Sequence, residues 1–232
     1  YREALARQQK RKRIKQIVAI VIGVVLITMT ALVIRTGFTE VKDTVLRNPS
    51  KLLLEKTPWV TSEYGAPGIT ISTPEVLERQ VVELPEEMKG KVQMITFAFT
   101  GVDTPLDIVI NSSKFASKPD ENGKEKEVPI DVLKVAEGVL DRFEKNGTKN
   151  ITTRNEQFIT PNGQEGIKTF GTGDFLIADK LIKGEYVILG FSTPNLLQQV
   201  ILTWKEEDVY ADQIIERILN SIELIKLTED EK

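Results

Sequence analysis

The most uniform hydrophobic stretch of the chain runs from Ile17 to Ile34. It contains no charged residue, and its only polar side chains are those of Thr28 and Thr30. A helix of this length is roughly 27 Å long, which is close to the hydrocarbon thickness of a bilayer. The pattern predicts a transmembrane helix that serves as a membrane anchor and tolerates Gly23. The alternatives are a buried core helix and a cleaved signal peptide.

A dense positive cluster precedes this stretch. It consists of Lys10, Arg11, Lys12, Arg13 and Lys15. Residues 1–16 carry a net charge of +6, and few basic residues follow the apolar stretch. The positive-inside rule therefore leaves this basic arm in the cytoplasm and sends the C-terminal domain to the periplasm or the cell exterior, with a bacterial inner membrane as the expected location. The arm either contacts anionic membrane lipid or only fixes the topology.

Residues 35–67 read as a juxtamembrane connector, because Asn48-Pro49 interrupts a weak helical pattern. Trp59 and Tyr64 follow within a stretch rich in proline and glycine. Two interpretations stay open for these aromatic rings. They lie at the headgroup level and contact a partner, or they pack under the edge of the domain.

Beyond the connector, strand-like and helical patterns alternate in blocks. Strands are predicted over residues 68–72, 92–100, 105–113, 151–160, 164–173, 184–193 and 195–204. Helices are predicted over residues 73–80, 130–147 and 208–224. The turn "PNG" predicts a hairpin between the strands on either side of it. Asp208 is expected to cap the last helix.

This order predicts an α+β fold, with the transmembrane helix followed by an antiparallel sheet and helices packed on it. The extracytoplasmic α/β domain is expected to cover residues 68–226, followed by a short tail over 227–232.

Three phrases carry a resemblance to a known family: "ITTRNEQFITPNGQEGIKTFGTG", "GEYVILGFSTPNLLQQVILTW" and "YADQIIERILNSIEL". Their order, after a glycine-led first strand, paired strands and an amphipathic helix, resembles the Mog1/PsbP-like α/β/α sandwich over residues 66–226. The resemblance implies a non-catalytic accessory or binding role at a membrane or on a larger complex. It supplies no functional residues to carry over.

Composition removes much chemistry. The chain has no Cys and no His, so a thiol nucleophile, a Ser-His-Asp triad and thiolate or imidazole metal sites are excluded. The whole chain carries −3, so the part beyond the apolar stretch carries −9, which argues against nucleic acid as a partner. The "GTGD" stretch lacks the remaining residues of a phosphate loop. We expect no enzymatic activity, no cofactor and no metal.

The sequence therefore predicts a membrane-anchored, non-catalytic accessory or scaffolding subunit that contacts membrane lipid and another membrane or periplasmic protein. One alternative is a tethered domain that binds a small molecule or lipid in a pocket lined by Phe97, Phe99, Phe170 and Phe191. Another is a hydrolase using Asp174 and Asp179. Three glycosylation sequons, at Asn111, Asn146 and Asn150, matter only in a eukaryotic secretory pathway.

Overall fold

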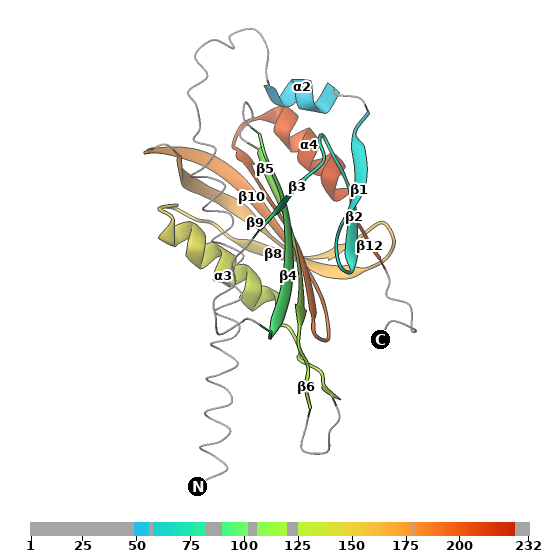
Figure 1. Ribbon diagram of the computed structural model, residues 1–232. Helices are drawn as coiled ribbons and strands as arrows, with labels where there is room; N and C mark the ends of the chain where they lie inside the picture. Colours follow the sequence, from blue (N-terminus) through green and yellow to red (C-terminus); the bar gives the residue numbers. More distant parts are fainter. Residues whose placement is uncertain are drawn as a thin grey trace.

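A seven-stranded antiparallel sheet forms the centre of the protein (Figure 1). The computed structural model describes residues 49–55, 58–81, 90–101, 106–119, 125–177 and 179–225. The sheet has the order β3-β4-β5-β11-β10-β9-β8. Its strands are β3 (Glu78–Gln80), β4 (Val92–Thr100), β5 (Leu106–Phe115), β8 (Arg154–Ile159), β9 (Glu165–Ile177), β10 (Lys180–Thr193) and β11 (Leu196–Lys205). A separate short hairpin pairs β6 (Lys118–Pro119) with β7 (Glu125–Lys126).

One face of the sheet is covered by α4 (Val209–Leu219) and by a small second sheet. That sheet has the order β1-β2-β12, with β1 at Val60–Gly65, β2 at Gly68–Thr73 and β12 at Glu223–Leu224. The short helix α2 (Pro49–Glu55) packs against α4. Ile214 and Ile218 of α4 join Ile69 and Ile71 of β2 in the largest apolar cluster, so this layer holds most of the core.

The opposite face is covered by α3 (Val132–Lys145), which lies over β9 and β10 (Figure 1). Ala136, Val139 and Phe143 of α3 pack on Ile188 of β10 and Ile201 of β11. These helix positions recur at three- and four-residue intervals, which places them on one side of the helix. The helix predicted over 130–147 is therefore α3, slightly shortened.

Both long helices begin at an aspartate. The carboxylate of Asp131 accepts a hydrogen bond from the backbone N–H of Lys134 at 3.2 Å, and Asp208 accepts from Tyr210 and Ala211 at the start of α4. An N-cap carboxylate satisfies backbone donors that have no partner inside the helix. The predicted cap at Asp208 is confirmed.

The turn between β1 and β2 is tied to the middle of the main sheet. This turn contains a cis peptide bond between Ala66 and Pro67. The Nε2 of Gln198 on β11 donates to the carbonyl oxygens of Pro67 (2.9 Å) and Gly68 (3.3 Å). The hydroxyl of Ser112 on β5 also donates to Pro67, at 3.4 Å. These polar side chains fix the small sheet on the large one.

The predicted fold class is wrong as stated. We expected an α+β protein led by a transmembrane helix, whereas the described residues form mostly antiparallel sheet with three short helices. No helix in this part of the chain is long and apolar enough to cross a membrane. The longest, α3, has 14 residues, and its length of roughly 21 Å is well short of a bilayer's hydrocarbon core. The predicted span from Ile17 to Ile34 lies outside the described residues.

Two predicted helices differ in the structure. Residues 73–80 are extended and bent rather than helical, because β3 pairs with the edge of β4. The last helix ends at Leu219 instead of residue 224. There the hydroxyl of Ser221 donates to the carbonyl of Ile218 at 2.7 Å, and Glu223–Leu224 pairs with β2 as β12. In both cases a neighbouring strand offers backbone hydrogen bonds that the local pattern does not reveal.

The boundary of the folded domain also changes. Residues 49–67, assigned to the connector, contribute α2 and β1 to the fold. Trp59 and Tyr64 are only 8% and 3% exposed and belong to the core. The Trp59 ring lies 3.9 Å from the Arg217 guanidinium carbon on α4, and Tyr64 packs on Phe97 with ring centroids 5.0 Å apart. Of the two interpretations left open for these rings, the structure shows packing within the domain. A contact of Trp59 and Tyr64 with a partner stays an untested prediction.

The buried hydroxyl of Tyr64 accepts a hydrogen bond from the backbone N–H of Leu77 at 2.9 Å. We expect Tyr64→Phe to lower the free energy of unfolding by about 1–3 kcal/mol, because the Leu77 N–H loses its partner away from water. Urea unfolding of the full chain, followed by tryptophan fluorescence, measures this change. Tyr210→Phe on α4 is the matched control, and equal stability of the two variants would contradict the assigned role.

Candidate functional site

The residues predicted to anchor and orient the protein lie outside the described part of the chain. They are Lys10, Arg11, Lys12, Arg13, Lys15, Ile17, Gly23, Thr28, Thr30 and Ile34. Their roles stay predictions from the sequence. A candidate site must therefore be built from the folded domain.

The four phenylalanine rings of the predicted pocket lie in or against the largest apolar cluster. Phe191 is buried and meets Phe158 edge-on, with ring centroids 6.1 Å apart. Phe97, Phe99 and Phe170 are partly buried and pack on the same cluster. Core packing accounts for all of these contacts, and the small-molecule alternative stays a prediction.

A polar row crosses the main sheet near the C-terminal end of α3. Asp107 on β5 lies directly opposite Thr100 on β4 and Thr203 on β11, and Thr203 lies opposite Tyr186 on β10. The Thr203 hydroxyl donates to Asp107 Oδ2 at 3.3 Å. The Tyr186 hydroxyl donates to the carbonyl of Thr152 at 2.8 Å. Directly opposed residues in antiparallel strands share a face, so these polar groups form one line on the α3 side.

Asp107 is the most perturbed carboxyl group among the described residues. Burial raises its pKa to about 6, although the hydroxyls of Thr100 and Thr203 lower it in part. Burial also raises the pKa of the Tyr186 hydroxyl. A carboxyl group whose pKa lies near 6 gains or loses a proton under mildly acidic conditions. The row can therefore bind and release one proton.

The end of the β9–β10 hairpin forms a second candidate site. The two strands run in register from Gly190 opposite Ile167 to Lys180 opposite Ile177, and their far end reaches the left margin of the molecule in Figure 1. Alternate residues of the hairpin share a face. We call the face that continues the α4 side the arm face. It consists of Thr172, Asp174 and Leu176 on β9 and Leu181, Lys183 and Glu185 on β10.

The arm face combines an apolar end with a polar base. Leu176 and Leu181 lie directly opposite each other and are 42% and 48% exposed. Asp174 lies opposite Lys183, and Thr172 lies opposite Glu185. The two leucines therefore form a small apolar pair on a strand surface that otherwise carries polar and charged side chains.

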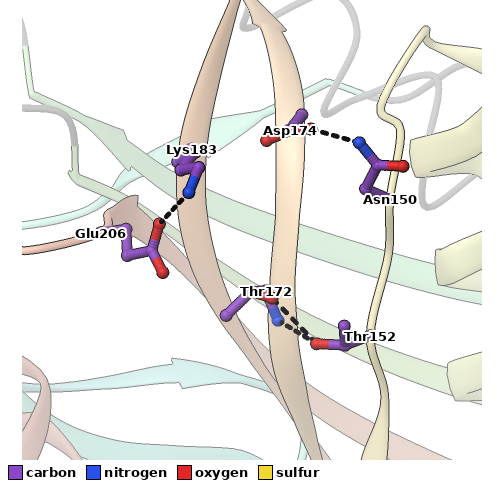
Figure 2. Close-up of polar contacts among 6 residues, drawn as sticks. All are labelled: Asn150, Thr152, Thr172, Asp174, Lys183 and Glu206. Atoms are coloured by element: carbon purple, nitrogen blue, oxygen red, sulfur yellow. Dashed lines mark hydrogen bonds and ion pairs between the residues drawn. The ribbon is translucent and has the colours of Figure 1, made fainter.

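Polar contacts hold the base of the arm face in place (Figure 2). Asn150 Nδ2 donates to Asp174 Oδ2 at 2.6 Å. The hydroxyls of Thr152 and Thr172 are 2.9 Å apart. Lys183 Nζ lies 3.9 Å from Glu206 Oε2. Each contact joins the hairpin to a neighbouring segment, so the base of the hairpin is held in place from both sides.

Negative charge gathers beside this base. The pKa of Glu185 is raised, first by burial and then by the nearby carboxylates of Asp212 and Glu206. Asp212 Oδ1 accepts from Trp204 Nε1 at 2.8 Å, which holds this carboxylate in the group. Burial is the larger cause of this shift, and the two carboxylates add to it, so Glu185, Glu206 and Asp212 lie close together at the base of the arm face.

The other face of the arm is braced by α3. Phe175 on β9 meets Phe143 of α3 edge-on, with ring centroids 5.4 Å apart. The Phe143 ring also meets Tyr186 edge-on at 5.7 Å. One side of the hairpin end thus packs on a helix. The leucines on the arm face are partly exposed, and Leu176 lies against Gly147 in the turn that follows α3.

The two aspartates of the hydrolase alternative take different positions. Asp174 belongs to the arm face, whereas Asp179 lies in the turn at its end with a φ of +63°. Within the described ranges, no group of three or more acidic residues could hold a metal ion. Sequence reasoning missed the arm face, because Leu176 and Leu181 lie outside the strand limits it drew.

No protein-family model matches this chain, and no curated protein is similar to it in sequence. The resemblance to Mog1/PsbP-like proteins is therefore still a prediction. Function has to be argued from the surfaces of the domain.

The raised pKa of Asp107 predicts a pH dependence of stability. Between pH about 4 and about 6 the folded state holds the proton that the unfolded state has lost, so the free energy of unfolding falls as the pH rises. Above pH 6 the folded state has also lost this proton, and the free energy of unfolding stops falling. The total decrease is at most about 3 kcal/mol. We expect Asp107→Asn to remove this dependence and to stabilise the protein at pH 7.

Urea unfolding of the full chain at pH 4.5 and pH 7 measures the effect. Asp141→Asn, at an exposed position of α3, controls for the loss of one negative charge. If the free energy of unfolding changed with pH in the same way in the wild-type and Asp107→Asn chains, Asp107 would have an ordinary pKa.

Proposed function

We propose that this protein is a non-catalytic accessory subunit, attached to a membrane, whose folded domain binds another membrane or envelope protein through the arm face. The observation that carries this proposal is the exposed pair Leu176 and Leu181 at the end of a braced hairpin. Interfaces typically place apolar side chains at their centre and polar groups around them. The arm face has this arrangement, with its leucines next to charged and hydroxyl-bearing residues.

The geometry of the hairpin supports a docking role. Burying two half-exposed leucines contributes roughly 1 kcal/mol each, and little ordering entropy opposes this because Phe175 and the Asn150–Asp174 bond already hold the strands. A fixed apolar end is better suited to binding than a mobile one.

Charge indicates the chemistry of the partner. Around the base of the arm face, four carboxylates (Asp174, Glu185, Glu206 and Asp212) outnumber two ammonium groups, those of Lys183 and of Lys149, the residue paired with Asp174. We therefore expect the partner to present an apolar recess with Lys or Arg beside it, since complementary charges speed association and exclude wrong partners. Screening by salt should weaken such a contact.

Attachment to the membrane is argued from the sequence alone. The uncharged stretch 17–34 and the basic residues before it favour a cytoplasmic N-terminus and an extracytoplasmic domain. Such tethering would raise the local concentration of the domain near a membrane-bound partner. A weak contact through a small surface would then suffice.

We expect the double variant Leu176→Asp/Leu181→Asp to lose its partner when the full chain is purified from membranes in mild detergent. A carboxylate at either position would be desolvated in an apolar recess and would add to the existing negative charge. Chemical cross-linking in intact cells followed by mass spectrometry measures partner recovery, which should fall at least tenfold.

Ile159→Asp is the matched control, because Ile159 is 59% exposed and lies on β8, away from the arm face. Its partner recovery should equal that of the unaltered chain. Equal loss in both variants, or a chain that is always recovered alone, would overturn the proposed docking role.

Deletion of residues 17–34 should release the chain from the membrane fraction, because the basic arm alone binds lipid only through screened charges. Fractionation with and without alkaline carbonate measures this release. Replacing Gly23 with Leu keeps the stretch apolar and is the control expected to stay attached. An unaltered chain that dissolves without detergent would contradict membrane attachment.

A further inference from the structure

Among the residues that the structure describes, three buried polar atoms on the α3 side of the main sheet have no hydrogen-bond partner. They are Nδ2 of Asn111 and Oγ of Ser113, both on β5, and Oε1 of Gln199 on β11. Each of these residues is only 1% exposed. Most buried polar groups in proteins are hydrogen-bonded, and each exception calls for an explanation.

The three residues form one patch. Asn111 lies directly opposite Gln199 in the β5–β11 pairing. Ser113 is two residues along β5 from Asn111, so its side chain points to the same face. The patch lies between two apolar clusters that α3 covers, one containing Val135 and Leu197 and the other Ala136 and Ile201. We call these three residues the buried polar patch.

A neighbouring threonine sets the orientation of the Asn111 amide. Thr96 Oγ1 on β4 donates to Asn111 Oδ1 at 2.8 Å. With its oxygen held on the β4 side, Asn111 has its Nδ2 as the free group, next to the strand that carries Gln199. The patch therefore offers a donor at Asn111, an acceptor at Gln199 and a hydroxyl at Ser113 that can serve as either.

The other face of the same strands shows how such groups are satisfied by protein. There Gln198 and Ser112 donate to the carbonyls of the turn at Pro67 and Gly68. On the α3 face the helix presents Val135, Ala136 and Val139, whose side chains can neither donate nor accept. The partners of the buried polar patch must come from elsewhere.

We propose that the buried polar patch binds an internal water molecule, bridging Asn111, Ser113 and Gln199 beneath α3. Buried waters typically make two to four hydrogen bonds to polar groups that lack protein partners. A water accepts from Asn111 Nδ2 and donates to Gln199 Oε1, and the Ser113 hydroxyl completes the set. Left dry, each of the three groups would carry an uncompensated desolvation cost, so the water would stabilise the α3 layer.

Substitution of Ser113 distinguishes a patch that holds a water molecule from one that holds none. With water bound, Ser113→Ala removes a made hydrogen bond, and the folding equilibrium constant of the full chain in mild detergent should fall roughly two- to tenfold. Without water, the same change removes an unsatisfied hydroxyl, and the chain should become more stable. An unchanged or increased equilibrium constant would overturn the proposal.

Ser112→Ala is the matched control. Ser112 is buried to a similar degree on the same strand, faces the opposite side, and has a protein acceptor at Pro67. Its loss of stability calibrates the removal of a bonded hydroxyl from β5. Ser113→Ala should show a loss in the same direction.

A direct measurement uses water-selective nuclear Overhauser spectra of the full chain. A long-lived water signal at the Asn111 side-chain amide is expected, and it should weaken in Gln199→Met, which keeps the side-chain length but removes the acceptor. A strong amide signal without any water contact would overturn the site, because it would show that Asn111 donates directly to Gln199.

Discussion

Strands β5 and β11 are buried on both faces, and the rest of the structure depends on this constraint. An antiparallel sheet usually leaves one face to water and alternates apolar and polar residues along each strand. Here α4 and the small sheet cover one face and α3 covers the other. Any polar side chain on these two strands is therefore removed from solvent and needs a partner inside the molecule.

The two faces meet this requirement in different ways. On the α4 side, Gln198 and Ser112 donate hydrogen bonds to the carbonyls of the β1–β2 turn. These bonds compensate for burying the two polar side chains, and they attach the small sheet to the main sheet at one defined position. On the α3 side, the oxygen of Asn111 accepts from Thr96, and its Nδ2 has no partner among the described residues. The polar side chains of β5 and β11 thus position the small sheet through hydrogen bonds. Beneath α3, the same two strands carry the unpaired hydrogen-bonding groups of the buried polar patch.

The end of the long hairpin β9–β10 differs from β5 and β11, because it is covered on one face only. Its inner half lies between the two covering layers, where Val187 and Leu189 belong to the core. Its outer half continues beyond α4, so the same alternation that packs Phe170 against the core leaves Leu176 42% exposed. Because α3 still braces the other face through Phe175, the exposed leucines are held in one position. The proposed docking role follows from this difference in how far the two layers extend.

The sequence by itself determined the parts of the protein that depend on local periodicity and capping. The stripe through Ala136, Val139 and Phe143 located α3, Asp208 located the start of α4, and the turn after Thr160 located the β8–β9 hairpin. These features need only near neighbours in the chain. The sequence also assigned Trp59 and Tyr64 to a connector, because nothing local reveals that β1 pairs with β2 and packs on β4 and β5.

Only the tertiary structure decided which faces of the strands are covered. Asn111 begins a glycosylation sequon in the sequence, yet pairing of β5 with β4 and β11 places it in the interior. Leu176 and Leu181 fell between two predicted strands, yet β9 and β10 continue through both of them and leave them partly exposed. Burial depends on layers contributed by residues far apart in the chain, and no local pattern carries that information.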